Sequence, residues 1–177
     1  MRKLVPISQL TPAQVDQLRM TVAADLLAEA ERKGHARDTM VVTDLLPNTD
    51  LNVTGATGGA NDYWNTPACV ANTETDIVNH ALDDDEFVAI YGIAMDDANP
   101  VTKVVKCLVG TAIVLAQWNL QELFCDMIPI GLTEEYPKWI GGDTVHVTMF
   151  SNPAKPAGDN LVLIGLICQP KGKRITK

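Results

Sequence analysis

The chain has 177 residues, of which 46% are hydrophobic and 20% charged, and its mean hydropathy is +0.04. This length suits one domain with a sizeable core, and the composition excludes a disordered chain, which would combine low hydrophobicity with high charge. The net charge of −8 argues against a protein that binds nucleic acid by neutralising its phosphates. We therefore predict a single domain over residues 1–177 with no specific nucleic-acid partner.

The first predicted element is an amphipathic helix over residues 12–33. Thr11 suits the N-cap position, Pro12 the first helical position and Gln14 the third position of a capping box. Gly34 is typical of a helix end. The apolar residues that recur at helical spacing are Val15, Leu18, Val22, Leu26 and Ala30. They predict a packing face on this helix.

Beyond Gly34 the sequence changes to short β-rich runs, separated by segments rich in Gly, Pro, Asn and Asp. The runs are 40–46, 50–54, 75–82, 86–95, 101–116, 126–132, 143–150 and 160–169. Several short strands without intervening helices indicate an antiparallel sandwich or barrel. Residues 116–124 alternate polar and apolar side chains as in a strand, although their spacing also suits a helix. We favour the strand.

These elements predict a mainly β fold: a single jelly roll, which is an eight-stranded antiparallel sandwich or barrel, preceded by one N-terminal amphipathic α-helix. We expect residues 1–10 to form an N-terminal arm and residues 11–34 the helix. The jelly roll should span residues 40–169, followed by a basic tail over 170–177.

Two predicted strands, 87–95 (FVAIYGIAM) and 161–168 (LVLIGLIC), are apolar on both faces. An antiparallel strand with one face in water alternates instead. Residues 144–150 (TVHVTMF) do so, which predicts that His146 and Thr148 face water. The helix can cover part of the outer face of the two apolar strands, and the remainder favours a neighbouring subunit. We therefore predict self-association.

An acidic run, Asp-Asp-Asp-Glu at residues 83–86, precedes the strand 87–95, and two further aspartates follow it at 96–97. Dense carboxylates can bind a divalent cation or perform acid/base chemistry. A strand rises about 3.3 Å per residue, so Glu86 and Asp96 would lie about 33 Å apart and could not share a ligand. A calcium site in 83–86 alone stays open, although the spacing of a calcium-binding loop is missing. Solvated strand ends are the favoured interpretation.

No catalytic, cofactor-binding or metal-binding residue can be nominated from motifs. The three histidines, His35, His80 and His146, lack the spacing of a local metal site, so a cupin-type centre would require all three to converge in space. Ser8 and Ser151 lie outside any nucleophile elbow. The glycine-rich segment 54–62 lacks the ending of a phosphate-binding loop. We predict a protein that is not an enzyme and needs no metal or cofactor.

Aromatic and cysteine side chains each allow two interpretations. Sugars could stack on aromatic residues in the predicted loops, or these residues could anchor the core or an interface; they are Tyr63, Trp64, Trp118, Tyr136 and Trp139. The cysteines are Cys69, Cys107, Cys125 and Cys168. They form no C-x-x-C pair, and we interpret them as small buried hydrophobes, with a disulfide or reactive thiol as the alternative.

Basic residues gather at the two ends of the chain, leaving 8 of the 14 basic residues against all 22 acidic ones in the remainder. The end residues are Arg2, Lys3, Lys171, Lys173, Arg174 and Lys177. Such ends can contact a membrane surface, a nucleic acid or an acidic neighbour, or be solvated tails. Neither a secretion signal nor a membrane span is predicted, because the apolar stretches are too short.

The overall pattern, a short helix before a jelly roll with strands apolar on both faces, resembles a viral coat protein. It is similar to the smaller of the two single-jelly-roll major capsid proteins of tailless, icosahedral, internal-membrane Thermus phages and related haloarchaeal viruses. The likeness rests on chain length, on the helix segment TPAQVDQL, and on strands such as EFVAIYGIAM and NLVLIGLICQ. It transfers no functional residue to this sequence.

The resemblance implies a structural protein of a thermophilic bacteriophage, made in the host cytoplasm and located in the virion. Copies would form a homodimer and co-assemble with a second, larger capsid protein into an icosahedral shell over the internal viral membrane. The basic termini would face that membrane. The alternatives are a carbohydrate-binding jelly-roll module, which would use the aromatic loops and calcium at 83–86, and a cupin-like metalloenzyme.

Overall fold

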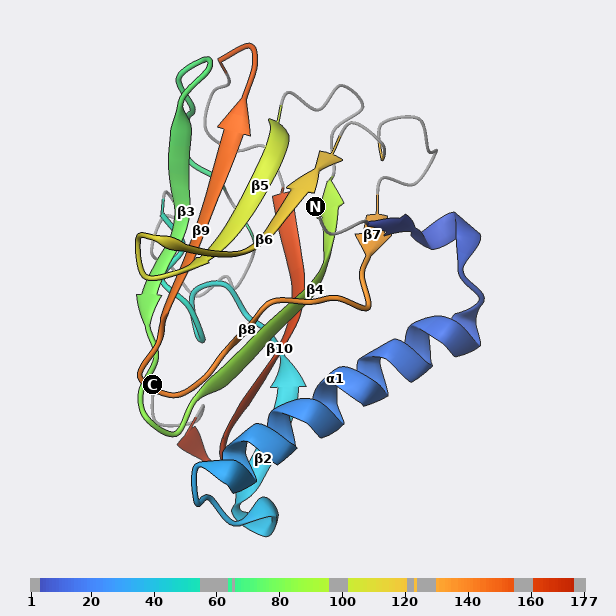
Figure 1. Cartoon of the computed structure of the whole chain (residues 1–177), viewed down its shortest axis with the longest axis vertical. Coiled ribbons are helices and arrows are strands. Elements are labelled where there is room, and N and C mark those ends of the chain that lie inside the picture. The colour runs from blue at the N-terminus through green and yellow to red at the C-terminus, as the bar shows by residue number, and fades with distance from the viewer. Residues whose placement is uncertain are drawn as a thin grey trace.

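The computed structural model describes residues 4–54, 64, 66–95, 102–120, 123, 130–154 and 161–173. This part of the chain contains ten strands in two antiparallel sheets and one long helix, which confirms the mainly β prediction (Figure 1). Among the described helices, none has the length and apolar character that crossing a membrane requires.

The helix α1 (Pro12–Arg32) begins and ends where the sequence predicts. The Thr11 hydroxyl accepts a hydrogen bond from the Gln14 backbone N–H at 3.3 Å, and the Gln14 side-chain oxygen accepts one from the Thr11 N–H at 2.8 Å. This reciprocal pair satisfies two N–H groups that a helix start leaves without partners. Gly34 adopts a φ of +94° just beyond the helix. Two single-turn helices flank α1: η1 (Ile7–Gln9) precedes it and η2 (Arg37–Thr39) follows it.

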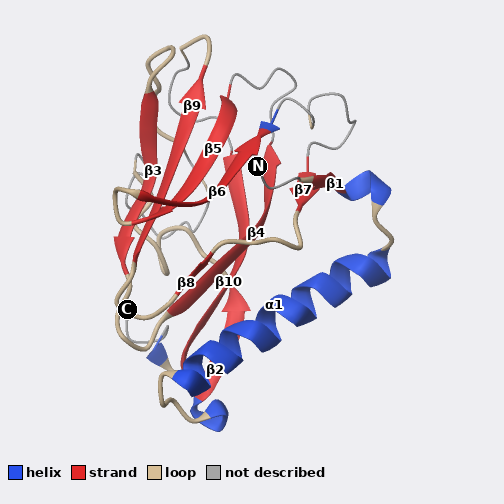
Figure 2. Ribbon diagram, viewed as in Figure 1, coloured by secondary structure: helices blue, strands red, loops and turns tan. Residues whose placement is uncertain are grey.

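The strands form a six-stranded sheet and a four-stranded sheet (Figure 2). The six-stranded sheet has the order β1 (Val5–Pro6), β7 (Ile130–Leu132), β4 (Phe87–Met95), β10 (Leu161–Pro170) and β2 (Met40–Asp44), and β8 (Lys138–Trp139) also pairs with β4. The four-stranded sheet has the order β3 (Glu74–Ala81), β9 (Thr144–Ser151), β5 (Thr102–Val109) and β6 (Ile113–Asn119).

The antiparallel pairs are nested around one turn. β5 pairs with β6, β4 with β7 and β8, β3 with β9, and β2 with β10, so that each pair encloses the previous one along the chain. Gly110, with a φ of +57°, lies in the innermost turn. Two further pairings, β4 with β10 and β5 with β9, connect the nested pairs laterally. The chain between Met40 and Pro170 therefore pairs as one long hairpin that is rolled into two sheets.

Strand β4 is buried on both faces, as its sequence predicts. Val88 and Ile90 belong to the core between the sheets, together with Trp118 and Trp139. The alternate residues of β4 face α1 instead. They form a second cluster with the helix, which contains Phe87, Ala89 and Tyr91 from β4 and Val22, Leu26 and Ala30 from α1.

The helix covers the outer face of β4 within a single chain, because Phe87, Ala89 and Tyr91 are all buried. The helix thus supplies the cover that the sequence analysis allowed it to supply over part of one sheet, and self-association stays a prediction. On the outer face of β10, Val162 and Ile164 are half-buried, so little of the apolar surface there meets water.

Several predicted strand boundaries differ from the structure. The run 101–116 is divided into β5 and β6 at Gly110, where the chain turns. The run 50–54 makes only an isolated bridge, from Val53 to Val78. The short strands β1 and β8 were not predicted, since two paired residues carry no periodic signal. Of the segment 116–124, β6 includes residues up to Asn119. Residues 126–129 and most of the glycine-rich segment lie outside the described residues.

The contact between α1 and the sheet should carry much of the stability. We expect Leu26→Ala to lower the free energy of unfolding by about 2–4 kcal/mol, because the side chain is fully buried and its removal leaves a cavity. The control Met20→Ala changes an exposed residue of the same helix and should stay within about 0.5 kcal/mol. Urea unfolding measures both values. Equal stabilities of the two variants would contradict this packing.

Candidate functional site

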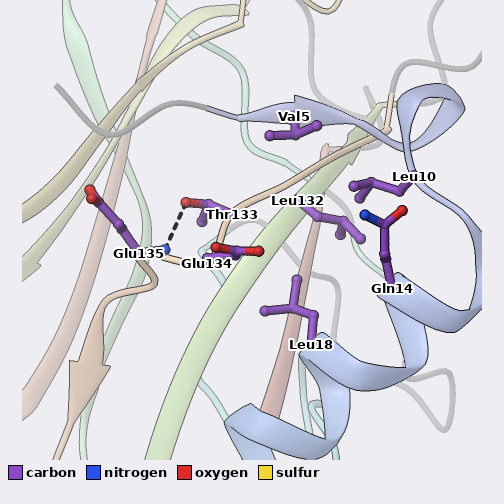
Figure 3. Close-up of a pocket in the computed structure, with 8 residues that line it drawn as sticks. All are labelled: Val5, Leu10, Gln14, Leu18, Leu132, Thr133, Glu134 and Glu135. Carbon is purple, nitrogen blue, oxygen red and sulfur yellow. Dashed lines mark hydrogen bonds between the residues drawn. The ribbon is translucent and has the colours of Figure 1, made fainter.

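A groove lies between α1 and the segment that joins β7 to β8. Its first part has a volume of about 410 Å³ and is lined by Val5, Leu10, Gln14, Leu18, Leu132, Thr133, Glu134 and Glu135. Figure 3 shows Leu10, Leu18 and Leu132 toward the helix, and Glu134 and Glu135 on the segment after β7. The Glu135 N–H donates to the Thr133 hydroxyl at 3.1 Å, which shapes the turn on this side.

The groove continues along the helix into a second part of about 470 Å³. Gln14, Leu18 and Glu134 line both parts, and Tyr136 lines the far end. An apolar floor with a carboxylate rim suits an extended peptide segment that carries apolar and basic side chains.

A polar network fixes the wall of this groove to the helix. The Tyr136 hydroxyl donates to Asp25 Oδ2 at 2.9 Å, and Lys138 Nζ contacts Asp25 Oδ2 at 2.7 Å and Glu29 Oε1 at 3.0 Å. Burial raises the pKa of Asp25, but the hydrogen bonds from Lys138 and Tyr136 outweigh burial and hold this pKa below its usual value. Burial and the bond to Asp25 raise the pKa of Tyr136.

Because of this network, the free energy of unfolding should depend on pH in the acidic range. Because the pKa of Asp25 is lower in the folded protein than in the unfolded chain, its contribution is complete above about pH 4 and is lost as the pH falls below that value. We expect Asp25→Asn to lower the free energy of unfolding by about 1 kcal/mol at pH 7 and by much less at pH 3.

Urea unfolding at the two pH values measures this difference. Asp16→Asn, an exposed position of the same helix, serves as the matched control. A deficit of Asp25→Asn that is the same at pH 7 and pH 3 would contradict the assigned role.

The acidic run at 83–86 contacts a lysine that is close to the C-terminal end of the sequence. Lys173 Nζ lies 2.9 Å from Asp83 Oδ2 and 3.2 Å from Glu86 Oε1, and it also pairs with Asp85. Glu86 is only 1% exposed, and its Oε2 accepts the Asp83 backbone N–H at 3.2 Å. The prediction that this run consists only of solvated strand ends is therefore wrong, because one of its carboxylates is buried and three of them bind the same ammonium group.

The contacts of Lys173 explain its charge state. Burial lowers the pKa of this ammonium group, but its bonds to Asp85 and Asp83 and the charge of Glu86 outweigh burial and leave the pKa raised. Among the described residues, no group of three or more His, Cys, Asp or Glu side chains could hold a metal ion. Asp96 and Asp97 lie outside the described residues.

Removing this lysine should destabilise the protein. We expect Lys173→Met to lower the free energy of unfolding by about 1–3 kcal/mol, because Glu86 would stay buried beside two other carboxylates. Lys171→Met is the control, since the ammonium group of this exposed lysine donates to a backbone carbonyl, that of Asp38, at 2.6 Å. It should cost less than about 0.5 kcal/mol. Equal stability of Lys173→Met and the wild type would overturn this role.

The effect of calcium on stability is a second test of the contacts between Lys173 and the acidic run. A site with a dissociation constant of about 10 μM would gain about 2.7 kcal/mol at about 1 mM calcium. We expect no such gain for the wild type, because the ammonium group of Lys173 occupies the centre of the carboxylates. A rise in the unfolding temperature with calcium would contradict this assignment.

The three histidines do not converge. His35 contacts Phe87 edge-on, with ring centroids 5.8 Å apart, and so lies near the helix cluster. His80 is the cross-strand partner of Val145, a core residue, which places it on the inner face of the four-stranded sheet. His146 is on the outer face of that sheet, since it alternates with core residues along β9. A cupin-type centre built from all three is therefore contradicted.

Of the aromatic residues that could stack on sugars, most that the structure describes are packed in the core instead. Trp118 and Trp139 are fully buried in the core, and Trp139 Nε1 donates to the Leu108 carbonyl at 2.7 Å. Trp64 is half-buried and packs against the same core. Trp118 and Trp139 cannot offer open faces for sugar stacking, which leaves the half-buried Trp64 and Tyr136. Tyr63 lies outside the described residues.

The described cysteines are buried and form no disulfide with one another: Cys69, Cys107 and Cys168. This confirms their interpretation as small hydrophobes. Burial raises the pKa of the Cys168 thiol to about 11, so it is almost entirely protonated near neutral pH. Cys125 lies outside the described residues.

The outer face of the four-stranded sheet is the other candidate surface. His146 and Thr148 were expected to face water, yet they are only 8% and 5% exposed. His146 Nδ1 lies 2.8 Å from the Gly110 carbonyl oxygen, and Nε2 lies 2.8 Å from Asp76 Oδ1. These two bonds join the β5–β6 turn to strands β9 and β3.

No protein-family model, no curated protein and no solved structure matches this chain.

Proposed function

We propose that the chain is a viral coat protein, a single jelly roll that pairs with itself and co-assembles with a second, larger coat protein into an icosahedral shell. The observation that carries this proposal is the nested strand pairing around Gly110. A jelly roll is a two-sheet roll of eight antiparallel strands. If β7 and β8 count together as the partner of β4, and β1 as part of the arm, the nested pairs supply these eight strands.

The jelly roll also occurs in lectins and cupins, so the sites must distinguish the functions. A lectin would need exposed aromatic rings, whereas Trp118 and Trp139 are buried. It would also use calcium at 83–86, where Lys173 already lies among the carboxylates. A cupin would need converging histidines, whereas His80 and His146 face opposite sides of one sheet. These observations favour the coat protein.

The two candidate surfaces lie on different sheets, which suits a protein with two kinds of neighbour. The groove beside α1 has an apolar floor and the carboxylates of Glu134 and Glu135 at its rim. A basic and apolar segment of the second coat protein would complement it. The outer face of the four-stranded sheet is available for a different contact (Figure 2).

The proposed contact with the viral membrane rests on a reduced set of basic residues. Lys173 is engaged by the acidic run, and Lys171 donates to the Asp38 carbonyl. The other basic residues of the two ends lie outside the described residues: Arg2, Lys3, Arg174 and Lys177. Within the proposal, these are the residues that would face anionic lipid.

The test is the assembly of the purified full chain. We expect sedimentation velocity to show a reversible dimer that grows with protein concentration, and negative-stain images to show regular larger assemblies at high concentration. A protein that remains monomeric at every concentration would contradict the proposal. Retention on immobilised glycans that depends on calcium would instead support the lectin. A gene for a second coat protein next to this one would be a further, independent support.

A further inference from the structure

The edge strands of the two sheets differ in how they are protected against pairing with another chain. Backbone N–H and C=O groups on the open side of an edge strand can bond to a further strand, and short length, proline, charge or a bulge prevents this. Strands β1 and β8 have two residues each, and β1 contains Pro6. Strand β3 carries Glu74 and Asp76 and has a shift in its register, and β6 pairs with β5 across another shift. These edges are all protected.

Strand β2 is the exception. Its five residues pair with β10 in continuous register, and Asp44, its last residue, is the one charged residue in it. Within the described part of the chain, no strand pairs with the second side of β2, which ends the six-stranded sheet (Figure 1). This edge is therefore the one most open to a further strand.

Two hydrogen bonds at the ends of β2 show which of its backbone groups face the open side. The Lys171 N–H donates to the Thr39 carbonyl at 2.9 Å, and the Leu45 N–H donates to the Gly165 carbonyl at 3.0 Å. Backbone groups of successive residues in a strand point to opposite sides, so the odd-numbered residues bond to β10 and the even-numbered ones point away from it. The N–H and C=O of Val42, at the centre of β2, thus point to the open side.

An apolar groove of about 420 Å³ lies beside this edge, under the flank of the helix. It is lined by Asp16, Arg19, Met20 and Ala23 of α1, by Val42 of β2 and by Leu166 of β10. Met20 is 60% exposed, and Val42 is half-buried. A strand added to β2 would bring side chains over this groove and remove both residues from water, which is favourable for apolar groups.

The charges beside the groove favour a second copy of the chain as the partner. Asp16 and Arg19 line it, and the guanidinium group of Arg19 lies 2.9 Å from Asp44 Oδ1. Because both signs are present, two copies related by a two-fold axis can place Arg19 of each near acidic groups of the other. The groove on the other side of α1 lacks this property, since its described lining includes Glu134 and Glu135 and no basic residue.

We propose that β2 pairs antiparallel with β2 of a second copy, which joins the two six-stranded sheets into one. Val42 is opposite Val42 of the second copy, because this register overlaps the two strands along their whole length and uses the outward N–H and C=O of both. The two-fold axis is perpendicular to the joined sheet, so both α1 helices lie on the same face and Met20 of each borders the seam.

This interface rests on the self-association in the proposed function and specifies where it occurs. A seam of five residues is about 16 Å long, which suits a weak, reversible dimer. The groove beside Glu134, on the other side of α1, is left for a different protein.

Charged substitutions at Val42 test the two-fold register. Val42→Lys and Val42→Glu should each weaken the dimer at least about tenfold, because like charges then lie directly opposite one another. An equimolar mixture of these two variants should form a heterodimer at least about tenfold tighter than either homodimer. The controls Val70→Lys and Ile113→Lys alter exposed apolar residues elsewhere and should change the dissociation constant less than about threefold. Sedimentation velocity measures these constants, and circular dichroism checks that each variant is folded.

Hydrogen exchange of the wild type provides a test that needs no substitution. The Val42 amide should gain protection as the protein concentration rises, since it bonds only across the seam. The amides of Val41 and Thr43 face β10 and should keep their rates. If the Val42 variants do not fold, Met20→Lys, at an exposed position beside the seam, should still weaken the dimer.

The outcomes separate this interface from the proposed function. A wild-type dimer that both Val42 variants leave unchanged, or in which the Val42 amide gains no protection, would overturn the interface and leave the function standing. Loss of the dimer in Ile113→Lys with Val42→Lys unaffected would place the contact on the other sheet and also overturn it. A wild type that never dimerises would contradict both proposals.

Discussion

The pairing of β4 with β10, buried on both sides, is the constraint on which the rest of the structure depends. The glycines show how closely neighbouring strands of this sheet approach one another. A Cβ at Gly92 would lie 2.5 Å from Leu132 Cδ2, and one at Gly165 would lie 2.5 Å from the Ala89 carbonyl oxygen. Both distances are well below van der Waals contact. One helix is used to cover this pair of strands, and no described helix is left for the four-stranded sheet. The proposed division of surfaces follows from that asymmetry.

Local signals in the sequence were sufficient for the helix and for the two strands that are apolar on both faces. Thr11, Pro12 and Gln14 determine a helix start through contacts within four residues, which makes the start of α1 readable. The apolar run of β4 likewise predicted burial on both sides. It could not reveal whether the cover comes from the same chain, because the placement of α1 depends on the fit of Leu26 and its neighbours against Phe87 and Tyr91.

Contacts between residues that are far apart in the chain could not be predicted from the sequence. Lys173 meets Asp85 across 88 residues, and neither its tail position nor the acidic run indicates a contact. The division at Gly110 was missed because the residues around it, apart from Thr111, are apolar. His146 alternates as a solvated residue would, yet it is buried, and the Gly110 carbonyl and the Asp76 carboxylate contact its two ring nitrogens. Periodicity identified the outer-face residues of β9, whereas the residues of β3, β5 and β6 that share this face follow only from the strand register.

Hydrogen exchange at low and high protein concentration most directly tests the claim that copies of this chain associate while α1 covers β4 within each copy. The account predicts that amides on the surface of the domain gain protection as the concentration rises, while those in the buried contact of α1 with β4 keep the same rates. Rates that are the same at both concentrations would contradict it.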